Sequence, residues 1–100
     1  MIRGTTPTHT FKLPFDVSQV KEVMVIYAQN DVEILRKNTV DCEMSNNEVC
    51  VTLSQEDTLR FSHYENLQVQ LRVLTVGGVA LTSGVHVVGV QKCLNNEVII

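Results

Sequence analysis

Tryptophan is absent from this 100-residue chain, and only five of its residues are aromatic. Sugar-binding sandwich domains usually need exposed aromatic rings, which offer a broad apolar face. We expect the phenylalanines in the core, which leaves Tyr27 and Tyr64 as the remaining rings for such a platform. The shortage of aromatic side chains therefore weighs against a carbohydrate-binding module.

Long apolar runs are also missing. No run approaches the roughly 20 residues that a membrane-spanning helix requires. The first seven residues, Met1–Pro7, lack the apolar stretch of a signal peptide. We therefore expect synthesis in a cytoplasm and no membrane partner.

Basic residues are few and scattered. The chain has eight Lys and Arg against eleven Asp and Glu, a formal charge of −3, and Arg36-Lys37 is its only adjacent basic pair. Nucleic-acid-binding domains usually carry a clustered basic face. The charge pattern therefore argues against a nucleic-acid partner.

The three cysteines are odd in number and lack C-x-x-C spacing, so they predict neither a zinc site nor a disulfide framework: Cys42, Cys50 and Cys93. A two-residue turn at Asn46-Asn47 would place Glu43 opposite Cys50, and Cys42 opposite Val51. Cys42 and Cys50 would then point to opposite faces of a hairpin. We expect three free thiols.

No catalytic constellation is visible. The three histidines are too far apart in the sequence to form a local ligand pair: His9, His63 and His86. The carboxylate pairs Glu56-Asp57 and Asp41/Glu43 are typical of solvated turns, and no nucleophile elbow surrounds a cysteine. We expect no enzyme activity, no catalytic residue, no cofactor and no metal.

Period-two alternation of apolar and polar residues recurs along the chain and predicts strands with one buried face. The predicted strands span residues 8–15, 20–29, 32–37, 39–44, 48–53, 66–76 and 79–92. Turn signals separate them at Asn30-Asp31, at Ser45–Asn47 and at Gly77-Gly78. The two glycines predict a long hairpin at the centre of the fold, because they tolerate the positive φ angles of a tight turn.

Three predicted strands carry irregular patterns. In residues 20–29 both parities are apolar, so this strand is either buried on both sides or covered by a partner. In residues 32–37 we expect Val32 and Ile34 to face the core. In residues 79–92 the inward parity changes, which indicates two covered faces or a β-bulge near Gly89.

The segment Ser54–Phe61 breaks the strand period. Ser54 followed by Asp57 approximates a capping box, so we expect one or two helical turns here. Together these elements predict an all-β fold: an immunoglobulin-like antiparallel β-sandwich of about seven strands with one short helical crossover near residues 54–61. Residues 1–7 are expected to form an N-terminal arm and residues 8–100 a single domain.

Several short stretches resemble a known family. They are the opening Arg3–Pro7 with the aromatic strand to Phe15-Asp16, the step Asp57–Leu59, and the strand Gln68–Leu74. The chain is similar in these stretches to the N-terminal immunoglobulin-like domain of the upper-baseplate proteins of tailed phages. Those proteins continue into receptor-linking regions, whereas this sequence stops at Ile100, so the resemblance implies a docking or adaptor module.

The resemblance implies a non-enzymatic structural role in a phage or prophage particle, near the tail or baseplate. The expected partners are other phage structural proteins and further copies of this chain, and the expected location is the virion. The candidate protein-docking residues are the wet face of one strand and the apolar C-terminal residues: Gln68, Gln70, Arg72, Val98, Ile99 and Ile100. The alternative is an immunoglobulin-like module that binds a ligand or carbohydrate.

Overall fold

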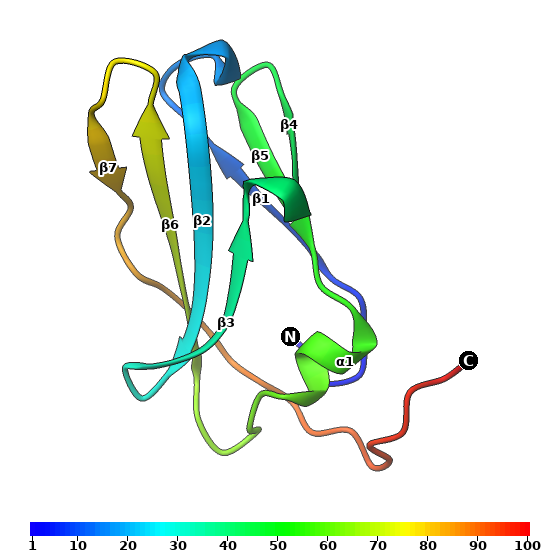
Figure 1. Ribbon diagram of the computed structural model, residues 1–100. Helices are drawn as coiled ribbons and strands as arrows, with labels where there is room; N and C mark the ends of the chain where they lie inside the picture. Colours follow the sequence, from blue (N-terminus) through cyan, green and yellow to red (C-terminus); the bar gives the residue numbers. More distant parts are fainter.

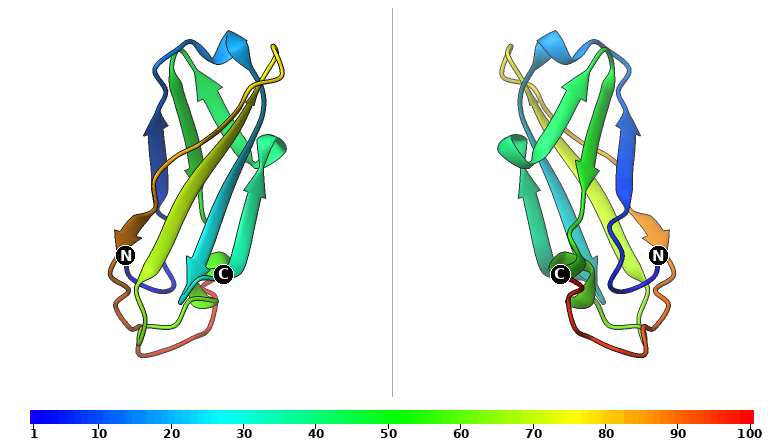
Figure 2. Two further views of the ribbon diagram at one scale, coloured as in Figure 1. Left: turned by 90° about the vertical axis from the view of Figure 1, so that its left-hand side faces the viewer. Right: turned by 90° about the vertical axis from the view of Figure 1, so that its right-hand side faces the viewer.

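The computed structural model describes residues Met1–Ile100 and consists of two antiparallel sheets packed face to face (Figures 1 and 2). The three-stranded sheet has the order β1-β5-β4, and the five-stranded sheet has the order β3-β2-β6-β7, with β8 also paired to β6. The strands are β1 Thr8–Lys12, β2 Val20–Gln29, β3 Val32–Asn38, β4 Cys42–Ser45, β5 Glu48–Thr52, β6 Leu67–Thr75, β7 Ala80–Thr82 and β8 His86–Val88. The predicted antiparallel β-sandwich is confirmed, with eight strands.

The division of strands between the two sheets differs from that in immunoglobulin domains. Immunoglobulin domains share the sandwich architecture, and their second strand lies in the sheet of the first. Here β2 pairs with β3 on one side and with β6 on the other, while β1 pairs with β5. β2 and β6 therefore form the middle of the larger sheet.

The core lies between the sheets and is made by one face of each strand. From Val23 to Gln29 in β2 and from Leu67 to Val73 in β6 every second residue is buried, as period-two burial requires. The buried apolar residues are Leu13, Val23, Val25, Tyr27, Leu35, Val49, Val51, Leu53, Phe61, Leu67, Val69, Leu71 and Val73. Phe11 and Phe15 are half-buried and pack against this cluster, in line with their expected place in the core.

The β2–β3 hairpin turns at Asn30-Asp31, as predicted, and both residues have positive φ angles of 51° and 62°. Its inward face differs from the prediction. A register shift between Tyr27 and Ala28 moves the buried position of β3 to Leu35, while Val32 is exposed. Val32 pairs with Gln29 at the end of the hairpin and is exposed there, and the bulge that places Leu35 inward is not visible in the alternation of one strand.

The β4–β5 hairpin has the predicted register. Glu43 pairs with Cys50 and Cys42 with Val51 across the turn at Asn46-Asn47. All three cysteines are free. The predicted strand at residues 39–44 is shorter at its start, because Thr39–Asp41 forms a 3-10 turn (η2).

The turn at Gly77-Gly78 lies at an edge of the larger sheet rather than at its centre (Figure 1). Of the two glycines in this turn, only Gly78 has a positive φ angle, 84°. The predicted strand over residues 79–92 is replaced by β7 and β8, each of three residues. The interruption is made by Ser83, whose hydroxyl accepts the Leu71 N–H (3.0 Å) where a strand carbonyl would otherwise bind.

The same interruption also changes which side chains face inward. Leu81 of β7 pairs with the inward Val73, whereas His86 of β8 pairs with the inward Val69. Since residues 81 and 86 have opposite parity, the face changes between β7 and β8. The predicted change of parity exists, but it lies at residues 83–85 and not near Gly89.

The helical crossover is the helix α1, Gln55–Leu59, and its capping box is confirmed. The Ser54 side chain accepts from the Asp57 N–H (3.1 Å), and the Asp57 carboxylate accepts from the Ser54 N–H (2.9 Å). Asp57 also forms an ion pair with Lys37 of β3 (2.9 Å). Burial alone would raise the pKa of the Asp57 carboxyl, but the bonds from Ser54 and the Lys37 ammonium outweigh it and lower the pKa.

No helix in the structure is long and apolar enough to cross a membrane.

Residues 1–7, the expected arm, lie along the domain. Met1 and Arg3 exchange backbone hydrogen bonds with Gln91, and the Arg3 guanidinium donates to the Leu59 carbonyl at the end of α1 (2.8 Å). The Thr58 hydroxyl is buried beside the N-terminal residues, accepting from Gly4 N–H (2.9 Å) and donating to the Thr5 carbonyl (2.9 Å). These contacts join the N-terminal residues to α1 and to the segment after β8.

Gln29 is a buried amide at the end of β2. Its Nε2 donates to the carbonyls of Ser62 (2.7 Å) and Glu65 (3.0 Å), and its Oε1 accepts the Ser62 N–H (2.8 Å). A buried polar side chain is retained only where such partners exist. Gln29 therefore holds the loop between α1 and β6 in place.

We predict that Gln29→Ala lowers the free energy of unfolding by about 2 kcal/mol, because it leaves buried backbone groups without partners. Urea denaturation measures the change. Gln19→Ala, at an exposed position in the 3-10 turn Val17–Gln19 (η1), is the matched control and should be close to neutral. Equal stabilities of the two variants would contradict the assigned role.

Candidate protein-docking surfaces

Two of the candidate docking residues, Gln68 and Gln70, have partners within the chain. The Gln68 amide accepts the Asp31 N–H (2.8 Å) and donates to the Asp31 carboxylate (2.9 Å), which ties β6 to the β2–β3 turn. Gln70 Nε2 donates to the Ser83 carbonyl (2.9 Å), at the interruption between β7 and β8. Both side chains therefore stabilise turns and edges of the larger sheet.

Arg72 differs from its two neighbours on β6. Its side chain is exposed and forms no hydrogen bond or ion pair within the chain. A free guanidinium keeps all five of its N–H donors available for another molecule. Arg72 is thus the member of the polar row best placed to contact a partner.

The row lies beside apolar side chains of β2. Met24 pairs with Arg72, and Ile26 pairs with Gln70, on the outer face of the larger sheet. Met24 and Ile26 are half-buried, and no other element of the chain covers this face (Figure 1). The apolar residues of 20–29 that alternate with the buried ones, such as Met24 and Ile26, thus lie on the outer face of a central strand.

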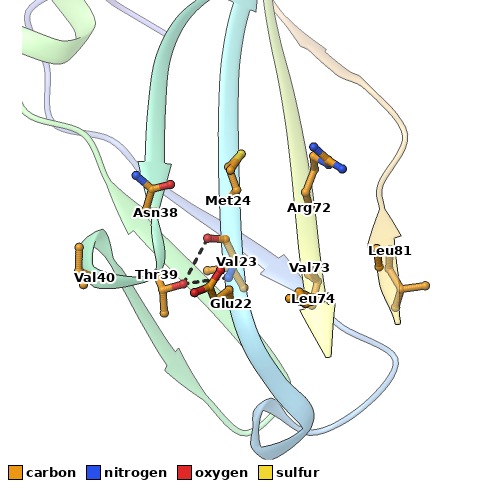
Figure 3. Close-up of a pocket in the computed structure, with 11 residues that line it drawn as sticks. Glu22, Val23, Met24, Asn38, Thr39, Val40, Arg72, Val73, Leu74 and Leu81 are labelled. Atoms are coloured by element: carbon orange, nitrogen blue, oxygen red, sulfur yellow. Dashed lines mark hydrogen bonds between the residues drawn. The ribbon is translucent and has the colours of Figure 1, made fainter. Parts of the chain in front are cut away.

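A hollow of about 480 Å³ lies at one end of this outer face (Figure 3). It is lined by Glu22, Met24, Asn38, Thr39, Val40, Arg72, Leu74, Ala80 and Leu81, together with the backbone neighbours Val23 and Val73. The Thr39 hydroxyl accepts the Val23 N–H (3.0 Å) and holds η2 against β2. Val40, a residue that is 93% exposed, lies at the rim of the hollow.

Sequence reasoning did not single out Met24, Leu74 or Val40 as surface residues. The one indication in the sequence was that both faces of the predicted strand at residues 20–29 are apolar. This pattern left open whether a partner or the chain itself covers the second face. Val40 carried no such signal, because it was predicted to lie in a strand rather than in η2.

The C-terminal candidates Val98, Ile99 and Ile100 lie at the end of the molecule that holds α1 (Figure 1). All three are exposed. Gln55 of α1 binds the backbone of Ile99: its Oε1 accepts the Ile99 N–H (2.8 Å), and its Nε2 donates to the Ile99 carbonyl (3.0 Å). The segment is therefore anchored through its backbone, with its apolar side chains in solvent.

His9 and Tyr27 form a pair of polar side chains inside the sandwich. His9 Nδ1 lies 2.7 Å from the Tyr27 hydroxyl, and the Tyr27 and Phe61 rings are in contact, with centroids 5.9 Å apart. Burial raises the pKa of the Tyr27 phenol, so it stays protonated and can donate to His9. Burial, and secondarily the positive N-terminus, lowers the pKa of His9.

Side chains that could bind a metal do not cluster elsewhere in the structure. No group of three or more His, Cys, Asp or Glu side chains has the arrangement of a metal site. His63 stacks on Tyr64, and His86 contacts Phe11 across the edge of the sandwich. Burial raises the pKa of the Cys42 thiol, which disfavours the reactive thiolate.

No protein-family model matches the chain, and neither a curated protein nor a solved structure matches it.

We predict that the fold loses stability as the pH falls from about 6.5 towards 5, because the unfolded chain binds a proton at His9 more readily than the native chain does. The loss cannot exceed about 1.4 kcal/mol per pH unit for this one group. Denaturant titrations above about pH 5 measure this loss of stability, because the titration of carboxyl groups lies mainly below that pH.

His9→Gln should flatten this pH dependence, since the amide can still hydrogen-bond to Tyr27 but does not titrate. His63→Gln is the matched control and should retain the slope. A His9→Gln protein with the slope of the wild type would contradict the assignment to His9.

Proposed function

We propose that this protein is a non-enzymatic structural or assembly module of a tailed-phage or prophage particle, associated with the tail or baseplate. It is made in the host cytoplasm and becomes part of the virion. It acts by docking on other structural proteins of the same particle. The proposal is supported by the resemblance of Arg3–Asp16 and Gln68–Leu74 to baseplate domains and by the surface of the larger sheet.

The observation that carries the proposal is the outer face of β2 and β6. An antiparallel sheet normally presents polar side chains to water on its free face. Here Met24 and Ile26 occupy that face on a central strand, beside Arg72, whose side chain has no hydrogen-bond or ion-pair partner. Methionine adapts to varied partner surfaces, and arginine is enriched at the centres of interfaces.

Electrostatics indicate the kind of partner surface that would fit. Arg72 lies among the apolar residues of the hollow, where Glu22 is the only acidic lining residue. A partner with an apolar knob beside a carboxylate would fill the hollow and pair with the guanidinium. This pairing would give orientation as well as affinity.

The test uses particles purified from the cells that encode the chain. We expect the protein to co-purify with tail or baseplate components and to be identified there by mass spectrometry. Arg72→Glu should lower its incorporation by about tenfold or more, as expected for loss of a charged anchor. Lys92→Glu, an equal change of charge on an exposed residue after β8, should leave incorporation unchanged.

Particles that contain their other tail proteins but lack this chain would refute the proposal. Genes for tail or capsid proteins on either side of its own gene would support it independently.

A second candidate, an immunoglobulin-like module that binds a glycan, depends on Tyr64. Tyr64 is 86% exposed, and its ring stacks on His63 with centroids 4.1 Å apart. The remaining aromatic rings are buried or half-buried against the core, so Tyr64 is the single ring available for a sugar. A glycan array that shows specific binding, abolished in Tyr64→Ala, would favour this candidate over the structural role.

A further inference from the structure

The sandwich is open along one edge. Between β1 of the smaller sheet and β7–β8 of the larger one lies a groove of about 400 Å³. Its apolar walls are formed by Phe11, Leu13, Phe15, Leu71, Val73 and Leu81. The groove therefore exposes part of the core between the two sheets.

The strand edges on both sides of this groove lack partners. β1 pairs only with β5, and β7 and β8 pair only with β6. Free strand edges present unpaired N–H and C=O groups to which an added strand can bind. The interruption at residues 83–85 also leaves Leu81 of β7 42% exposed. The groove thus combines backbone donors and acceptors with an apolar floor, as β-strand addition requires.

The chain itself carries a segment with matching properties, residues Glu97–Ile100. Val98, Ile99 and Ile100 are exposed, and Ile99 is 81% exposed. Gln55 binds both the N–H and the C=O of Ile99, as a neighbouring strand would. The segment is thereby held with its apolar side chains free, and an added strand pairing would replace the two bonds from Gln55 at Ile99.

The charges of the two surfaces are complementary. Lys12 and His86 line the groove, and no acidic residue does. The segment begins with the carboxylate of Glu97 and carries no basic residue. The segment would therefore bring an acidic side chain, and no basic one, to a groove that has basic lining residues and no acidic ones.

The segment does not occupy the groove of its own copy. It is bound to α1, at the end of the molecule that also holds the N-terminus, whereas the groove extends towards the Gly77-Gly78 turn at the opposite end (Figure 1). The principal dimension of the molecule is 46 Å. Segment and groove are therefore two separate surfaces of one copy.

We propose that residues Glu97–Ile100 of one copy insert as an added strand into the groove between β1 and β7–β8 of a second copy. Because the two surfaces differ, the contact is head-to-tail and leaves each pair with one free groove and one free segment. The chain therefore builds rings or filaments rather than closed two-fold dimers. This goes beyond the proposed function, since it concerns copies of this chain alone.

The experiment follows self-association of the purified wild-type chain by sedimentation velocity over a micromolar to sub-millimolar range. We expect species larger than a dimer that grow with concentration. Ile99→Asp removes the segment contact, and Leu81→Asp blocks the groove. Each should weaken association by about tenfold or more, since each places a charge in an apolar contact. Both positions are exposed in the single copy, so both variants should fold.

A mixture of the two variants gives the sharpest result. The Leu81→Asp copy has an intact segment, and the Ile99→Asp copy has an intact groove, so the mixture should form a one-to-one dimer that does not grow further. Val32→Asp is the matched control, an exposed valine at the start of β3 that lines neither the hollow nor the groove, and should associate as the wild type does.

A wild-type chain that stays monomeric over the whole range would overturn the proposal. Variants that associate normally, or a mixture that remains monomeric, would overturn it as well. None of these results bears on incorporation into particles, which depends on Arg72 and is measured separately.

Discussion

The long antiparallel pairing of β2 with β6 is the interaction on which the rest of the structure depends. It joins Val20–Ala28 to Gln68–Thr75, whose paired residues are 40 to 55 positions apart, and places Val25 and Leu71 side by side in the core. The remaining strands attach to this pair: β3 to one side, β7 and β8 to the other. The three-stranded sheet covers its inner face. Because nothing in the chain covers its outer face, the same pairing that builds the core also displays Met24 and Arg72 to solvent.

Buried polar contacts then determine how the loops close over the ends of the sandwich. Gln29 holds the loop before β6, and Thr58 joins α1 to Gly4 and Thr5. Asp57 caps α1 and also pairs with Lys37, which links the helix to β3. An apolar core is tolerant of which side chains fill it, but a buried hydrogen bond is satisfied only in one geometry. These contacts therefore give the α1 end a defined shape, in which Gln55 presents residues 97–100.

Local patterns predicted the regular elements well and the candidate surfaces less well. The turn at Asn46-Asn47, the register of Cys42 with Val51 and the capping box of Ser54 with Asp57 were all correct, because each depends on residues close in sequence. Arg72, Gln68 and Gln70 looked equivalent by parity. They differ because Gln68 hydrogen-bonds to Asp31, 37 residues away, and Gln70 to Ser83, whereas Arg72 has no partner within the chain. The incorrect inward face of β3 and the interruption between β7 and β8 arise in the same way, from pairing with distant strands.

The sequence by itself determined the antiparallel β-sandwich class, the hairpin turns and the short capped helix. Alternation, turn residues and caps act over a few residues, and their physics is therefore visible in a linear chain. Only the tertiary structure decided which strands share a sheet, which polar side chains remain free, and where the sandwich stays open. These features depend on contacts between segments that the chain brings together only when it folds. The groove beside β7, the free guanidinium of Arg72 and the position of Val98–Ile100 at the opposite end are all of this second kind.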